Sequence, residues 1–95
     1  MQYNFEWNQG KAKTNIRKHK ISFEQAATIF KDPRAISIYD DEHTDSEDRW
    51  ISLCLTSNGI LLVVHHAFEQ LDNNVIIRII SSRKATKREA KQYKV

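Results

Sequence analysis

The chain has 95 residues, of which 40% are hydrophobic and 28% are charged, with only two Gly and one Pro. This length holds one domain, residues 1–95, and the composition is that of a folded protein and excludes a disordered tail. The longest apolar run, residues 60–64, is too short to cross a bilayer, and the first ten residues lack the apolar segment of a signal peptide. We therefore expect a cytoplasmic protein without a membrane partner. The single cysteine, Cys54, excludes an internal disulfide.

The first third of the chain predicts one strand followed by two helices. Aromatic residues alternate with polar ones over residues 3–7, the pattern of a half-buried strand. Residues 8–18 are polar and compatible with a shallowly packed surface helix, for which Asn8 is a suitable N-cap. A second helix is predicted over residues 23–31, because a capping-box pattern begins at Ser22 and a Pro follows the last turn.

The rest of the chain predicts four strands and a final helix. The expected strands are residues 35–39, 49–56, 60–69 and 75–82. A tight hairpin turn at residues 57–59 and a looser turn at residues 71–74 separate the last three, which indicates an antiparallel meander. A second capping-box pattern, formed by Thr86 and Glu89, begins the last helix near Lys87. We therefore expect an α+β domain: an antiparallel sheet of four to five strands with two N-terminal helices and one C-terminal helix, all on one face of the sheet.

Charge is segregated along the chain, although the net charge is only +3. Residues 11–20 and 83–94 contain 11 of the 15 basic residues, and residues 40–48 contain six of the 12 acidic ones. This distribution indicates a positive surface able to attract an anion or an acidic protein. Two ordinary solvated helix faces would produce the same pattern.

Several basic residues lie where the last strand and the last helix are predicted to meet. Alternation places Arg78 on the more open face of its strand, where it could pair with an acid such as Glu69 or bind a phosphate. Arg83 and Lys84 precede the helix, and Lys87 in its first turn opposes the helix dipole. This placement favours an external anion.

A histidine and two aromatic residues accompany the basic blocks. His19 is flanked by Lys18 and Lys20, and neighbouring positive charge favours the neutral imidazole that a general base needs. The same three residues could instead complement the negative end of a helix dipole. Trp7 and Tyr93 could stack on nucleic-acid bases, although burial in the core is the favoured role for Trp7.

The chain shows no motif of a metal or nucleotide site. His65 and His66 are adjacent in a predicted strand, so they point to opposite faces and cannot share one metal ion. No Gly-rich phosphate loop is present, and we expect no metal and no cofactor. Arg49 precedes Trp50 in its strand and therefore faces the other way, toward the side that Arg78 occupies.

Three blocks of the chain together match the pattern of a known protein family. They are FEWNQGKAKTNIRKHKISFEQAATIF (residues 5–30), DRW (48–50) and RIISSRKATKREAKQY (78–93). In this order they resemble the BrnT toxins of type II toxin–antitoxin systems, with Lys20 standing where that family usually has Gly. The resemblance implies a RelE-like ribonuclease fold, an enzyme that arrests translation by cutting RNA, and a cognate BrnA-type antitoxin. It also implies that operator DNA is bound only through the complex with the antitoxin.

The resemblance suggests roles for residues at matching positions. These are Trp7, Lys18, His19, Arg49, Arg78, Arg83, Glu89 and Tyr93. The expected reaction is metal-independent cleavage in which His19 is the base or acid and the three arginines stabilise the phosphorane. We expect RNA to be bound by Trp7, Lys18, Lys84, Lys87 and Tyr93. Two alternatives use the same basic blocks: a non-catalytic nucleic-acid-binding module, and a surface that serves mainly an acidic protein partner.

Overall fold

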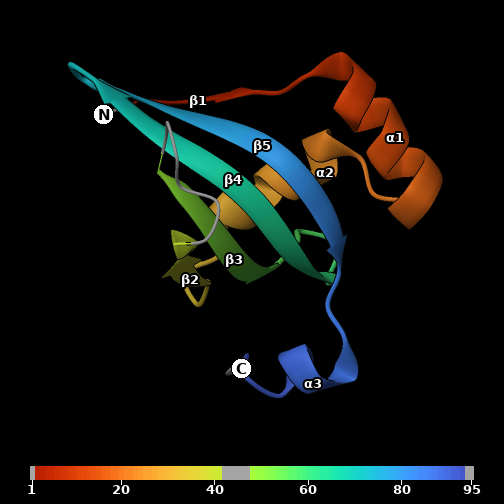
Figure 1. Ribbon diagram of the computed structural model, residues 1–95. Coiled ribbons are helices and arrows are strands. Elements are labelled where there is room, and N and C mark those ends of the chain that lie inside the picture. The colour runs from red at the N-terminus through yellow and green to blue at the C-terminus, as the bar shows by residue number, and fades with distance from the viewer. Residues whose placement is uncertain (1, 42–47, 94–95) are drawn as a thin grey trace.

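A five-stranded sheet with strand order β1-β5-β4-β3-β2 forms the centre of the protein (Figure 1). The computed structural model describes residues 2–41 and 48–93, so most of the acidic segment, with its His43, lies outside the described residues. The elements are β1 (Gln2–Glu6), α1 (Gln9–His19), α2 (Phe23–Ala27), the 3-10 helix η1 (Thr28–Lys31), β2 (Ile36–Tyr39), β3 (Arg49–Leu55), β4 (Leu61–Leu71), β5 (Asn74–Lys84) and α3 (Lys87–Ala90). Among these helices, none is long and apolar enough to span a membrane. The predicted α+β class is confirmed.

The sheet is mixed, which corrects the prediction of a wholly antiparallel one. Strands β2 to β5 form the expected antiparallel meander. Strand β1, however, runs parallel to β5, with Gln2 opposite Asn74 and Glu6 opposite Arg78. Alternation reveals a strand but not its neighbour. Because α1, α2 and η1 carry the chain from β1 to β2 at the opposite edge, β1 is left to pair with the outer side of β5 (Figure 1).

The helix starts follow the predicted caps. The Asn8 side chain accepts a hydrogen bond from the Lys11 N–H at 3.0 Å, and the Ser22 hydroxyl accepts one from the Gln25 N–H at 3.0 Å. The predicted helix over residues 23–31 is present but tightens into η1 for its second half. Short 3-10 turns of this kind are common at helix ends.

The core lies between one face of the sheet and the N-terminal helices. Its buried members are Ala12, Ile21, Phe23, Ala26, Ile29, Cys54, Leu62, Val64 and Ile79. Trp7 is half-buried and packs edge-on against Phe23, with 6.0 Å between the ring centroids. Burial raises the pKa of the Cys54 thiol to about 12, so this cysteine is a buried apolar residue without nucleophilic character.

A β-bulge interrupts the alternation of β5. His65 pairs with Ser81, but the next residue of β4, His66, pairs with Ile79, which leaves Ile80 as an extra residue. The buried serine on the core side is therefore Ser82. Ser81 joins Ile80 on the open face, whereas strict alternation along the strand would place it on the face of Ile79.

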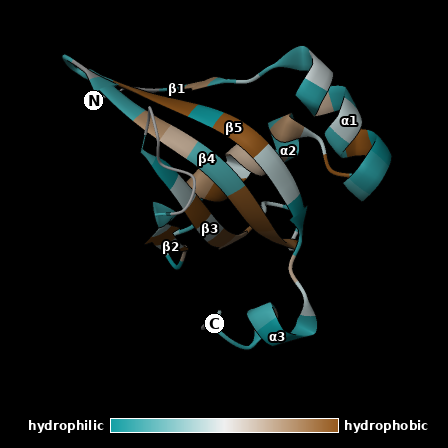
Figure 2. Cartoon of the chain, in the orientation of Figure 1, coloured by the Kyte–Doolittle hydropathy of each residue, from teal (hydrophilic) through white to brown (hydrophobic). Residues whose placement is uncertain are grey.

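The C-terminal helix α3 lies on the opposite side of the sheet from α1 and α2, so the expectation that all helices cover one face is wrong. Glu89 and Gln92 close a cavity of about 100 Å³ over open-face side chains of β2, β3 and β4. Helix α3 has four residues and none of them is buried. It is largely hydrophilic in Figure 2, so apolar packing cannot be what fixes its position.

Candidate active site

Two arginines stand on the open face of the sheet at the same level. In the strand register Arg49 is opposite Ala67, and Ala67 is opposite Arg78. The two guanidinium groups therefore project from the strands on either side of β4, with only a methyl group between them. Both side chains are half-buried and both have interaction partners within the protein. The prediction from strand alternation that both arginines lie on the same face of the sheet is confirmed.

A hollow of about 230 Å³ lies next to this pair. It is lined by Asp40, Arg49, Trp50, His65, Ile80 and Ser81. His65 belongs to the same face as Ala67, two residues before it on β4, and its side chain is half-buried. The hollow therefore brings an imidazole and a guanidinium group to one opening.

A larger hollow, of about 550 Å³, lies between α1 and β5. Its lining residues are Asn8, Gly10, Lys11, Thr14, Asn15, Lys18, His19, Ile80 and Ser81. Lys18 and His19 are exposed in the last turn of α1, and Lys18 supplies positive charge on this side. Because Ile80 and Ser81 line both hollows, the two meet at the β-bulge.

The buried side chain of Asn15 fixes α1 against β5. Its amide donates to the carbonyl oxygens of Ser82 at 2.8 Å and Ile21 at 2.9 Å, and its oxygen accepts from the Ser82 N–H at 3.0 Å. Strand β1 pairs with β5 only as far as Arg78, so Asn15 satisfies backbone groups that no strand reaches. Sequence reasoning missed this residue, although its spacing of three from buried Ala12 placed it on the packed side of the helix.

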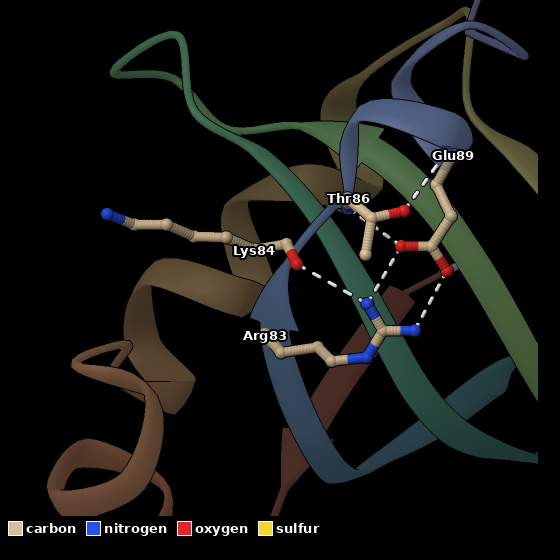
Figure 3. Close-up of polar contacts among 4 residues, drawn as sticks. All are labelled: Arg83, Lys84, Thr86 and Glu89. Atoms are coloured by element: carbon tan, nitrogen blue, oxygen red, sulfur yellow. Dashed lines mark hydrogen bonds and ion pairs between the residues drawn. The ribbon is translucent and has the colours of Figure 1, made fainter.

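Arg83 is joined to Glu89 by a bidentate ion pair (Figure 3). Both nitrogen–oxygen distances are 2.8 Å, and the same guanidinium donates to the Lys84 carbonyl at 3.3 Å. Glu89 also accepts from the Thr86 N–H at 2.8 Å and completes the predicted capping box. The hydrogen bonds from Arg83 lower the pKa of Glu89 to about 2, and the pair raises the pKa of Arg83. This arrangement attaches α3 to the end of β5.

A second link holds the residues that follow α3. The Tyr93 hydroxyl donates to Asp32 at 2.6 Å, and the Leu55 N–H donates to the same carboxylate oxygen at 2.9 Å. The hydrogen bond to Asp32 raises the pKa of Tyr93. In this structure Tyr93 thus anchors the C-terminal segment between η1 and the end of β3.

The predicted site residues divide into two groups. Arg49 on the sheet and Lys18 and His19 on α1 line the adjoining hollows, and Arg78 lies one strand away from Arg49 across Ala67. Arg83, Lys84, Lys87 and Tyr93 lie at the α3 end of the molecule, where the Lys84 side chain points away from the ion pair (Figure 3). Trp7 packs on the core, which agrees with the second of the two roles that the sequence allowed for it, burial in the core.

The other strand histidine is structural. His66 is fully buried, and its Nε2 lies 2.7 Å from the Ser52 hydroxyl. Its ring is in edge-on contact with Phe30 and Phe68. Burial, assisted by the nearby His65, lowers the pKa of His66 to about 4, so it is neutral near pH 7.

This fold and site define a class of protein: a small α+β domain whose open sheet face carries two neighbouring arginines. Residues 7–89 match the family described as "Ribonuclease toxin, BrnT, of type II toxin-antitoxin system". The chain therefore belongs to the BrnT family of ribonuclease toxins, and a toxin of a type II system implies an antitoxin partner.

A solved structure shows the same fold. The 1.1 Å crystal structure of the Brucella abortus ribonuclease toxin BrnT is similar with a TM-score of 0.61 and 20% sequence identity, over 92% of this chain and 100% of that one. At this identity the likeness establishes the fold alone. No curated protein matches the chain. The RelE-like character expected from sequence stays a prediction.

Proposed function

We propose that this toxin is a metal-independent endoribonuclease that acts in the cytoplasm, inhibits translation by cleaving RNA, and is neutralised by a cognate BrnA-type antitoxin. The observation that carries the proposal is the pair Arg49 and Arg78, which stand one strand apart on each side of Ala67. Two arginines on the strands that flank Ala67 present planar forks of donors on the same face, which suits them to hold one phosphate between them.

The reaction follows from RNA chemistry and these side chains. The 2′-oxygen attacks the adjacent phosphorus, the bond to the 5′-oxygen breaks, and the products are a 2′,3′-cyclic phosphate and a 5′-hydroxyl. Arg49 and Arg78 stabilise the added negative charge of the phosphorane, and His19 transfers a proton. Lys18 holds a neighbouring phosphate in the larger hollow. Charge from two arginines is our reason for proposing that no metal is required.

The residues near α3 take supporting roles in this proposal. Lys84 and Lys87 are exposed and contact flanking phosphates. Arg83 contributes positive charge while its bidentate pair with Glu89 positions α3. Tyr93 and Trp7 support the surface, through the contacts with Asp32 and Phe23, and present their rings to bases only at their exposed edges.

Growth of cells that express the chain tests the toxin function. We expect induction of the wild-type chain to arrest growth, and co-expression of the BrnA-type antitoxin to restore it. An Arg49→Ala, Arg78→Ala variant should be harmless at the same protein level. The matched control Lys31→Ala, on η1 and exposed, should remain toxic. Harmless expression of a folded, unmutated chain would count against the proposal.

The antitoxin in this proposal covers the cationic open face, and operator DNA binding belongs to the toxin–antitoxin complex. Neutralisation by contact predicts that added antitoxin and RNA compete for the same chain. A ternary complex of toxin, antitoxin and RNA in size-exclusion chromatography would contradict this part of the proposal.

A further inference from the structure

Cleavage of RNA through its 2′-hydroxyl requires two proton transfers at opposite ends of the reacting phosphate. One group takes the proton of the 2′-hydroxyl, and another gives a proton to the leaving 5′-oxygen. Arginine is unsuited to either transfer because its guanidinium stays protonated. His19 supplies one of the two groups, so the proposed reaction, on which this inference rests, lacks the second.

The structure places one further histidine beside the arginine pair. His65 lines the smaller hollow together with Arg49 and Ser81. In the register it is opposite Ser81 on β5, and the next open-face residue of its own strand is Ala67, which stands between the two arginines. The half-buried imidazole is therefore next to the position where a phosphate held by both guanidinium groups would lie.

The charged groups around His65 come from three elements. Asp40 follows β2, Arg49 belongs to β3, and Arg78 belongs to β5. Imidazole is the side chain best suited to give or take a proton near neutral pH. His66 cannot take this role, because it is buried on the other face and bound to Ser52.

The β-bulge puts His19 and His65 on adjoining surfaces. His19 lines the larger hollow, His65 lines the smaller one, and Ile80 and Ser81 line both. An RNA strand that crosses Ser81 would have one histidine on each side. We propose that His65 is the second proton-transfer group of the reaction, and that it acts with His19 from the opposite side of the bound phosphate.

The step balances without a further reactant. One neutral imidazole accepts the proton of the 2′-hydroxyl while the 2′-oxygen bonds to phosphorus. The other imidazole, protonated at the start, donates its proton to the 5′-oxygen as the phosphorus–oxygen bond breaks. The two histidines finish with exchanged protonation states, and solvent restores them. No oxidation or reduction is involved.

Single-turnover cleavage by His65→Gln tests the assignment. The rate constant should fall by about 100-fold or more, the usual contribution of acid–base catalysis, while RNA affinity changes little. The wild-type pH–rate profile should be bell-shaped, with one limb missing in His65→Gln and the other missing in His19→Gln. The exposed Glu24→Gln on α2 is the control, and should keep the wild-type rate and both limbs.

Two further measurements separate catalysis from structure. Imidazole in solution should restore part of the rate of His65→Ala. RNA with sulfur in place of the bridging 5′-oxygen has a leaving group that needs no proton, so it should restore whichever histidine variant lacks the acid. His65→Gln with both limbs and the wild-type rate would overturn the inference, as would a variant impaired only in RNA affinity. If the wild-type chain also leaves RNA intact, the proposed function itself fails.

Discussion

At Lys20 the backbone has φ 62° and ψ 27°, a left-handed conformation that favours glycine. The residue ends α1, and its N–H donates to the Ile16 carbonyl at 2.9 Å. This is the position where the sequence departs from the BrnT pattern, which usually has Gly. The departure therefore leaves local strain at the end of the helix that carries Lys18 and His19.

We expect Lys20→Gly to stabilise the protein by roughly 0.5–1 kcal/mol, because relief of the left-handed strain exceeds the added entropy of the unfolded chain. Urea unfolding monitored by circular dichroism measures the change. The same substitution in the middle of the helix, Lys13→Gly, should destabilise by about 1 kcal/mol. Equal losses at both positions would show that Lys20 carries no strain.

His66 makes stability depend on pH. Its pKa is lowered from 6.5 to about 4 by burial, so below pH 6.5 the unfolded chain binds a proton that the folded chain does not. The stability that this group contributes is present above pH 6.5 and is lost as pH falls toward 4, by roughly 3 kcal/mol in all. His66→Phe keeps a ring between Phe30 and Phe68 and should flatten that slope. An unchanged slope between pH 7 and 4.5 in urea titrations would contradict this cause.

The face of the sheet on which a strand residue lies was predictable where the strand alternates regularly, and was not predictable after the β-bulge. Arg49 and Arg78 face the open side as expected. Ser81 does not follow alternation, because the bulge at Ile80 shifts every later residue of β5 by one face. The roles of Asn15 and His65 depend on contacts between distant segments, which spacing along the chain does not contain.

Helix α1 is attached to the sheet by Asn15, so this one side chain positions the basic turn of the site. Asn15→Leu removes the partners of the Ser82 N–H and of two buried carbonyl groups. We expect a loss of roughly 2–4 kcal/mol in the free energy of unfolding, because buried polar groups lose their hydrogen bonds. Thr14→Leu, a neighbouring change without these bonds, should cost much less. Equal stability of the two variants would show that the hydrogen bonds of Asn15 contribute little to the free energy of unfolding.

Helix α3 is held by polar contacts, so it should detach in acid. The Arg83 pair lowers the pKa of Glu89 to about 2 from an ordinary value of 4.5. The stability that the ionised Glu89 contributes is therefore complete above pH 4.5 and is lost as the pH falls toward 2. Glu89→Gln should increase amide hydrogen exchange in residues 86–90 at pH 7, with at most about 1 kcal/mol of global destabilisation. Protected α3 amides in Glu89→Gln would mean that other contacts hold the helix.

Element types were more predictable than their partners. Caps at Asn8, Ser22 and Thr86 located three helix starts, because a capping hydrogen bond is local in sequence. The parallel pairing of β1 and the position of α3 on the open face were not predictable. Both depend on contacts between segments that are far apart in the sequence, such as β1 with β5 and Tyr93 with Asp32.

At the scale of the whole molecule, the two basic blocks lie in different places, one on α1 and the other at α3. The α1 block approaches Arg49 through the hollows that join at Ser81. The second block surrounds α3, where one of its arginines is paired with Glu89. The charge distribution shows that basic residues are grouped along the chain, and the fold determines which of them lie near one another.

Cleavage of RNA by the purified chain in excess EDTA is the most direct test that the arginine face is catalytic. The wild-type protein should form 2′,3′-cyclic phosphate products. Arg49→Ala, Arg78→Ala should be slower by about 100-fold or more, and Lys31→Ala should be unaffected. Intact RNA at micromolar enzyme, or salt-sensitive binding without product, would contradict the account and favour a non-catalytic nucleic-acid-binding module.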